Sequence, residues 1–214
     1  MRQELHKYVI DGSPYILMLQ EHLLNKGRIA EFGHPLQANW VTLWGHGYGS
    51  EENAGGVCIS IKEKWKNHIV HSANLIQARA QFVVLEEKGI QWGLLNIYAP
   101  NQVVERKQFW KYIWEHIPSS VKEWIVGGDF NMVEDPNDRC GGKLVTLHGP
   151  ELPEWEKLIF QMHLTDTWHL RNFSRERLSL RFSRSSLLSQ RSPTTTTAEE
   201  ASSSTCRAAT NLLQ

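Results

Sequence analysis

The sequence lacks the features that mark secreted and membrane proteins. Its 214 residues hold three cysteines, Cys58, Cys140 and Cys206, with no C-x-x-C pair, so neither a disulfide framework nor a zinc ribbon is supported. No apolar run approaches the ~20 residues that a membrane-spanning helix needs, and the start carries no long apolar signal segment. We expect a soluble intracellular protein, in the nucleus or the cytoplasm, without membrane contact.

An excess of charge of one sign is also missing. The chain has 23 basic and 23 acidic residues, so no global basic field attracts nucleic acid. Without the segment 172–214, which has 6 Arg and 3 Glu, the remainder is slightly acidic. Contact with nucleic acid must therefore come from a local patch, and nothing in the composition indicates an oligomer.

Several familiar site motifs are absent as well. The chain has no G-x-x-x-x-G-K-[ST], no G-x-S-x-G and no H-E-x-x-H, which argues against a nucleotide cradle, a hydrolase elbow and a zinc helix. A calcium loop starting at Asp129 would need Gly and Glu where Glu134 and Cys140 stand. The chemistry has to come from other residues.

What is present is a mixture of short apolar strands and amphipathic helices. Strands are predicted at 15–21, 39–44, 55–61, 80–86, 90–100 and 122–126, with 80–86 and 90–100 joined as a hairpin. A short helix is expected near the N-terminus, at 2–10. Longer helices are predicted with buried faces at Phe109, Tyr112, Ile113 and His116, and at Leu152, Trp155, Leu158, Ile159 and Met162. This mixture favours an α/β (α+β) fold, a layered sandwich of mixed β-sheets flanked by helices.

Four stretches place polar groups where an apolar strand ends, which is where α/β proteins tend to hold their chemistry. They are "LMLQE" with Glu21, "NIYAPN" with Tyr98 and Asn101, "VGGDFN" with Asp129 and Asn131, and "LTDTW" with Asp166. Each has a plainer interpretation: Glu21 as a solvated strand end, Tyr98 as a half-buried aromatic, and Asp129 and Asn131 as turn formers.

In this order the stretches resemble the endonuclease/exonuclease/phosphatase (DNase-I-like) family. Within it they are most similar to the apurinic-type endonuclease domain of non-LTR (LINE-type) retrotransposons. The resemblance covers roughly residues 2–171 and rests on "LLNIYAPN" and "GGDFNMVEDPNDRCGG". It implies a DNase-I-like sandwich that hydrolyses phosphodiester bonds in DNA with the help of a divalent metal.

The resemblance also implies a role for each matching residue. Glu21 corresponds to a metal ligand, and Asp129 to a second ligand and to the acid that orients or deprotonates the attacking water. Tyr98 corresponds to the phenol near the attacked phosphate and Asn101 to the amide that follows it. Asn131 corresponds to the amide that contacts the phosphate and holds the acid in place. The implied cofactor is Mg²⁺, with Mn²⁺ as an alternative.

Two parts of the family pattern have no counterpart in the sequence. Family members open with a strand that bears an asparagine in a W-N-x-R-G-like context, and they close with a Ser-Asp-His motif. We therefore expect an incomplete domain, impaired catalysis, and DNA binding that is weak or lost. Two alternatives stay open: a non-catalytic remnant with at most weak binding of metal or nucleic acid, and a phosphatase of the same family, which "IYAPN" disfavours.

The composition changes abruptly after Arg171. Residues 172–214 contain 10 Ser, 6 Thr and 6 Arg, and no Trp or Tyr. Such a segment buries too little apolar surface to offset its ordering entropy, so we expect it to be largely disordered. The predicted division is a partial nuclease-like domain at 1–171 and a Ser/Thr/Arg-rich tail at 172–214.

This division predicts that limited proteolysis trims the tail early and leaves a core that ends near Arg171, because exposed and unpaired backbone is cleaved first. Mass spectrometry of the digestion products would locate the cleavage points. Protection of Arg184 and Arg191 equal to that of the core would contradict the division.

Overall fold

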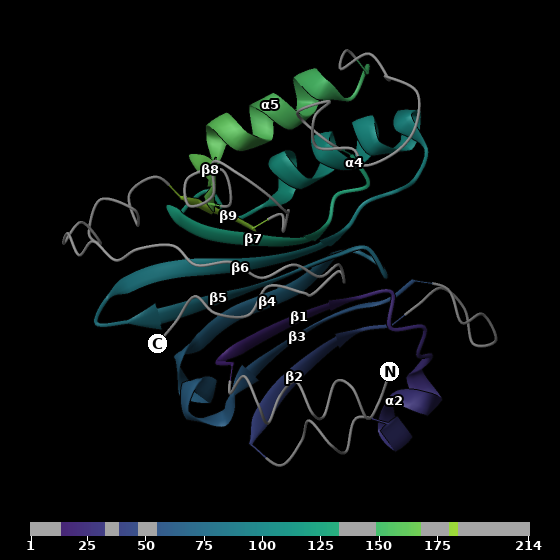
Figure 1. Cartoon of the computed structure of the whole chain (residues 1–214). Helices are drawn as coiled ribbons and strands as arrows, with labels where there is room; N and C mark the ends of the chain where they lie inside the picture. Colours follow the sequence, from purple (N-terminus) through teal and green to yellow (C-terminus); the bar gives the residue numbers. More distant parts are fainter. Residues whose placement is uncertain (1–13, 33–38, 47–54, 133–148, 168–179, 184–214) are drawn as a thin grey trace, which may run out of the picture.

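The computed structural model of the chain describes residues 14–32, 39–46, 55–132, 149–167 and 180–183. In these ranges two β-sheets lie face to face, and two helices cover the outer side of the larger sheet (Figure 1). The elements that build the layers are β1 (Ile16–Gln20), α2 (Lys26–Phe32), β2 (Trp40–Gly45), β3 (Val57–Lys62), η1 (Glu63–His68), β4 (Ile69–Ile76), β5 (Ala80–Glu87), β6 (Ile90–Tyr98), α4 (Val103–His116), β7 (Glu123–Asp129), α5 (Leu152–Gln161), β8 (Leu164–Asp166) and β9 (Leu180–Ser183).

The larger sheet mixes antiparallel and parallel pairing, as the strand and helix pattern predicts. The smaller sheet has the antiparallel order β1-β3-β2, and the larger has the order β4-β5-β6-β7-β9-β8. In the larger sheet β6 and β7 are parallel, and helix α4 makes the crossover between them. A crossover helix must lie on a face of the sheet, which places α4 on the outer side. The predicted fold class is confirmed.

Strand periodicity divides the apolar side chains between two cores. One core fills the space between the sheets and contains Ile59, Ile61, Val83, Leu85 and Leu94. The other lies between the larger sheet and the helices and is rich in aromatic rings. Its largest buried members are Phe82, Trp110 and Trp155. Because successive side chains of a strand point to opposite faces, β5 and β6 contribute to both cores.

Helix α4 buries two of the four residues that the sequence predicts for its apolar face, Phe109 and Ile113, while Tyr112 and His116 are exposed. The buried residues are Arg106, Phe109, Trp110 and Ile113, whereas Tyr112 is 42% exposed. Arg106, Trp110 and Ile113 follow helical i, i+4, i+7 spacing, with Phe109 beside them, and form a continuous stripe against the sheet. Tyr112 was predicted to be buried with His116, and this was wrong. The two rings instead stack on each other at the surface, with centroids 3.9 Å apart, so they need no core contact.

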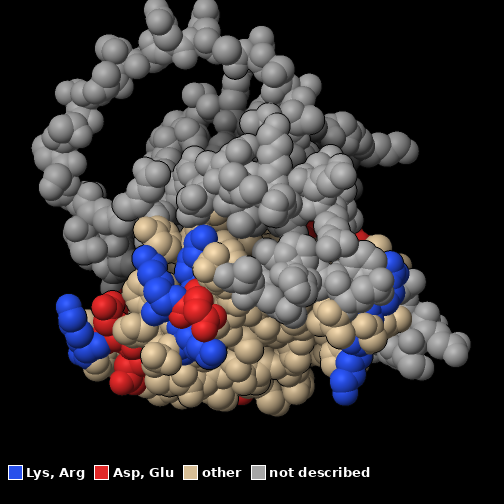
Figure 2. Space-filling model, turned by 90° about the horizontal axis from the view of Figure 1, so that it is seen from below, with Lys and Arg blue, Asp and Glu red and all other residues tan. Residues whose placement is uncertain are grey.

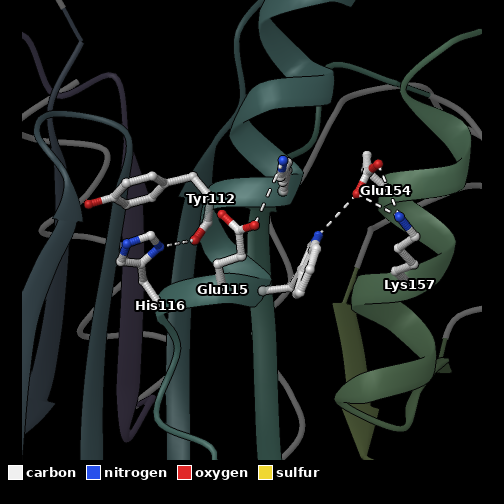
Figure 3. A network of polar contacts seen from close by, with 7 residues as sticks. Tyr112, Glu115, His116, Glu154 and Lys157 are labelled. Atoms are coloured by element: carbon white, nitrogen blue, oxygen red, sulfur yellow. Dashed lines mark hydrogen bonds and ion pairs between the residues drawn. The ribbon is translucent and has the colours of Figure 1, made fainter.

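The exposed sides of α4 and α5 are linked by a polar network (Figure 3). The Trp114 indole Nε1–H donates to Glu154 Oε2 at 3.1 Å, and Lys157 Nζ lies 3.2 Å from Glu154 Oε1. Desolvation raises the pKa of Glu154, but the hydrogen bonds from Lys157 and Trp114 and the charge of Lys157 together outweigh it, so the pKa lies below its ordinary value. The predicted face of α5 is confirmed, since Trp155, Leu158 and Met162 are buried.

Several elements were not predicted. Strand β4 carries His71, Ser72 and Asn74, so its apolar pattern is weak, and β8 is only three residues long. Strand β9 lies beyond Arg171 and pairs with both β7 and β8. The helix expected at 2–10 and most of 172–214 lie outside the described residues, so the division at Arg171 stays a prediction.

The charged side chains of the described residues do not form one field on the face seen in Figure 2, which views the molecule from the side of the smaller sheet. Among the residues drawn in colour there, basic and acidic groups lie next to each other at the left of the view. Lys66 and Glu63 of η1 form an ion pair at 3.2 Å. Of the helices described, none combines the length and the apolar character needed to cross a membrane; the longest, α4, has 14 residues.

Strand β9 leads to a test of the domain boundary. A chain that ends at Arg171 loses β9, which pairs with three residues of β7 and three of β8. We expect it to unfold at lower urea concentration than a chain that ends at Arg184. The loss should be roughly 2 kcal/mol or more, since each hydrogen bond contributes about 1 kcal/mol. Equal urea midpoints would show that β9 adds nothing and that the fold ends near residue 171.

Candidate active site

The ends of β1 and β6 meet although they belong to different sheets. The Tyr98 hydroxyl, at the last residue of β6, donates to Glu21 Oε1 at 3.0 Å, directly after β1. Both strands end at the same edge of the sandwich (Figure 1). Two residues 77 positions apart in the sequence thus form one polar contact at this edge.

Strand β7 brings Asp129 to the same place. In the parallel pairing of β6 and β7, Tyr98 is the partner of Asp129. Asp129 Oδ1 accepts the backbone N–H of Asn131 at 3.0 Å, and the Asn131 side-chain amide donates to Ala99 O at 2.7 Å. Asn131 therefore holds both the acid and the loop after Tyr98. Glu21, Tyr98, Asp129 and Asn131 are brought together, while their chemical roles stay predictions.

Two of these residues have an uncommon backbone conformation. Glu21 has φ 52° and Asn131 has φ 47°, in the left-handed region that non-glycine residues rarely occupy. Asn tolerates this region better than Glu does, and each such residue costs about 1–3 kcal/mol unless the surroundings compensate. Gly128, at φ 143°, permits the close approach of β7, because a Cβ there would collide with the backbone of Ile97. Strain of this kind concentrates at functional sites.

His22 supports the turn that carries Glu21. Its Nδ1 accepts the backbone N–H of Leu24 at 3.0 Å, and its Nε2 lies 3.3 Å from Gly45 O. Burial lowers the pKa of His22, which favours the neutral ring with Nε2 as donor. Gly56 lies against the ring, and a Cβ there would collide with it. Both ring nitrogens are thus committed to the backbone.

The surroundings of Tyr98 favour its neutral phenol. Desolvation raises its pKa above 10.0, and the hydrogen bond to Glu21 and the charges of Glu21 and Asp129 raise it further. The Arg79 guanidinium, 4.9 Å from the ring centroid, acts in the opposite direction. At neutral pH the hydroxyl is therefore a hydrogen-bond donor.

Asn101 is placed differently from the other predicted residues. Asn101 is exposed, and the contact found for it among the described residues is a hydrogen bond from Arg106 to its backbone carbonyl rather than to its side chain. Arg106 Nη1 donates to Asn101 O at 2.7 Å and to Pro100 O at 3.1 Å. Arg106 Nη2 also pairs with Glu151 Oε1 at 3.1 Å, with both residues 7% exposed. The pair fixes the loop between β6 and α4.

Sequence reasoning missed Arg79 and Arg106, because an isolated arginine on an amphipathic pattern is usually a solvated group. Asp166, a weaker candidate, lies on β8. Strand β9 separates β8 from β7, so Asp166 is two strands away from Asp129 in the sheet.

The oxygen donors present suit a hard cation. Glu21 and Asp129 each commit one carboxylate oxygen to a hydrogen bond, and each has a second oxygen with no hydrogen-bond partner among the described residues. Two exposed carboxylates with water as the remaining ligands are the donor set that Mg²⁺ prefers. Within the described ranges, no group of three or more His, Cys, Asp or Glu side chains gathers that could hold a metal.

The Tyr98–Glu21 contact predicts a late-titrating tyrosine. In alkaline titration followed by ultraviolet difference absorption, one phenol should ionise above pH 10.0 and disappear in Tyr98→Phe. Glu21→Gln should lower this pKa, because it removes the carboxylate charge that disfavours the phenolate. Since the folded state raises the pKa, stability contributed by Tyr98 is present below pH 10 and is lost as the pH rises through the raised value. No change in Glu21→Gln would contradict the contact.

Comparison with known proteins finds similarity in sequence and in fold. A curated relative, the transposon TX1 uncharacterized 149 kDa protein of Xenopus laevis, is 28% identical over 119 residues, which are 55% of this chain and 9% of that protein. The chain thus spans a small part of this relative's length.

Two solved structures share the fold. The AP endonuclease LMAP of Leishmania major aligns with a TM-score of 0.62 at 14% identity, covering 84% of this chain and 73% of its own. The APE2 catalytic domain of Xenopus laevis aligns with a TM-score of 0.65 at 13% identity, covering 85% and 77%. The pattern of the Endonuclease/Exonuclease/phosphatase family matches residues 1–198, so the chain belongs to this family.

Proposed function

We propose that the site is that of a nuclease-type phosphodiesterase which acts on DNA with a divalent metal, Mg²⁺ or Mn²⁺. The observation that supports this best is the meeting of Glu21, Tyr98 and Asp129 at one edge, with Asp129 braced by Asn131. Family membership and the similarity to AP endonucleases agree with it.

In the proposed hydrolysis, Asp129, Tyr98 and Asn101 each have a separate role. Asp129, with one oxygen held by Asn131 N–H, orients a water molecule through the other oxygen and accepts its proton. The Tyr98 hydroxyl is neutral, and it is available to donate to a phosphate oxygen as negative charge develops there. The exposed Asn101 lies in the loop that follows Tyr98, where its amide is available to bind the phosphate backbone.

Glu21, together with Asp129, would hold the cation. A bound Mg²⁺ supplies charge neutralisation at the phosphate and at the leaving oxygen. Glu21 accepts the Tyr98 hydroxyl through Oε1, which leaves Oε2, without a hydrogen-bond partner among the described residues, as the oxygen that would bind the cation.

A second candidate is a non-catalytic remnant that keeps the shape of the site. It is favoured because the asparagine-bearing first strand and the Ser-Asp-His motif of the family pattern have no counterpart in the sequence. Catalytic groups that act as a unit lose function together, so activity does not scale with the number of residues kept. We therefore propose that this chain has impaired catalysis.

Nicking of supercoiled plasmid in the presence of Mg²⁺ tests both proposals. We expect the purified chain to give no more nicking than Asp129→Ala. A chimera that receives the asparagine-bearing strand and the Ser-Asp-His segment from a relative that has both should nick, because these are the parts of the family pattern without a counterpart in this sequence. In the chimera, Asp129→Ala should lower the rate by roughly 10²-fold or more, since the water loses its orienting base.

The controls separate the candidates. Glu21→Ala in the chimera should raise the Mg²⁺ concentration needed for half-maximal nicking. The matched control is Glu63→Ala, which removes an exposed acid remote from the site and should leave this concentration unchanged. If the unmodified chain nicks and Asp129→Ala stops it, the remnant proposal is wrong. A chimera that folds and stays inactive would refute the nuclease proposal.

A further inference from the structure

The candidate site is divided between two sheets, and no strand pairing among the described residues joins them. Glu21 follows β1 of the smaller sheet, whereas Tyr98 and Asp129 end β6 and β7 of the larger one. The interior between the sheets is filled mainly by aliphatic side chains such as Ile59, Val83 and Leu94. Apolar packing is non-directional, so it favours contact between the sheets without closely fixing the position of one sheet relative to the other. A directional contact between the sheets constrains the separation of the two halves of the site more closely than apolar packing does.

Asn96 of β6 provides such a contact. Its side chain is 0% exposed, and its Nδ2 donates to two carbonyls of the smaller sheet, Leu19 O and Cys58 O, both at 2.9 Å. Its Oδ1 accepts Nε2–H of Gln20. Leu19 and Cys58 are register partners in the β1–β3 pair, so Asn96 contacts both strands at one level. Both donors and the acceptor of one buried amide are thus used across the interface.

The position of this amide along the strand relates it to the site. Leu94, Asn96 and Tyr98 lie on the same face of β6, because strand side chains alternate. Leu94 belongs to the apolar interior, Asn96 follows it, and Tyr98 reaches Glu21. Gln20 directly precedes Glu21 in the chain. Of the two hydrogen-bonded amides, Gln20 is therefore adjacent in sequence to the Glu21 carboxylate, and Asn96 is two residues before the Tyr98 phenol.

We propose that Asn96, together with Gln20, is a positioning residue that sets the separation of Glu21 from Tyr98 and Asp129. This inference rests on the proposed function for its chemical meaning, but the contact it predicts can be measured without metal or DNA. Asn96 acts through its neighbours: when its hydrogen bonds are lost, the sheets keep their apolar packing but shift, and the Tyr98–Glu21 bond is broken.

The Tyr98–Glu21 bond can be read from the Cζ resonance of Tyr98 in protein labelled with ¹³C at tyrosine Cζ. The signal that disappears in Tyr98→Phe is the Tyr98 Cζ resonance. The chemical shift of this resonance in Glu21→Ala is the reference for a Tyr98 hydroxyl without the bond to Glu21. The test variant is Asn96→Leu, which keeps the site filled but removes the amide. The matched control is Leu94→Ala, on the same face of the same strand, which weakens the apolar interior without removing a directional contact. Urea unfolding of each variant measures its stability.

We expect Asn96→Leu to move the Tyr98 resonance more than half of the way to its position in Glu21→Ala, and Leu94→Ala to leave it near the parental position. An unmoved resonance in folded Asn96→Leu would overturn the proposal. An equal movement in Leu94→Ala would also overturn it, since general loosening would then suffice. If Asn96→Leu does not fold, Gln20→Leu decides: a movement in the same direction supports the proposal, and its absence refutes it. A failed nicking assay leaves these outcomes unchanged.

Discussion

The parallel pairing of β6 with β7 is the constraint on which the rest of the structure depends. Seven consecutive register pairs, from Trp92 with Glu123 to Tyr98 with Asp129, bring the phenol and the acid side by side. Parallel strands need a crossover, and α4 supplies it on the outer face. The crossover in turn buries Arg106, whose guanidinium binds the loop that follows Tyr98. One pairing therefore determines the placement of a helix, a buried cation and a loop.

The buried ion pair of Arg106 and Glu151 fixes this loop, but its formation requires both charges to lose their hydration. A charge taken out of water is stabilised only by a partner and by further hydrogen bonds. Arg106 has both, although its Nε and Glu151 Oε2 have no partner among the described groups. Removing one member of a buried pair typically destabilises a protein by about 3–5 kcal/mol. The loop between β6 and α4 is thus coupled to the start of α5, which is distant in the sequence.

The parts of the fold that the sequence predicted are those with strong local signals. Strands β5 and β6 have long apolar runs and a short turn, and α5 has a clear apolar stripe. Strand β4 was missed because an edge strand with His71 and Asn74 has little apolar alternation, and β9 because its residues resemble a polar tail. Glu21 and Tyr98 were found through resemblance to a family. Asn96 was not found, because a buried amide shows its role only when its distant partners, such as Leu19 O, are known.

The left-handed conformation of Glu21 has a consequence for the history of related sequences. Glycine or asparagine would adopt φ 52° with less strain than glutamate, so stability alone favours replacement of this residue. Only selection for the carboxylate would oppose that replacement. Among related sequences, the residue at this position would therefore separate chains in which the carboxylate is still under selection from chains in which the backbone strain has been relieved.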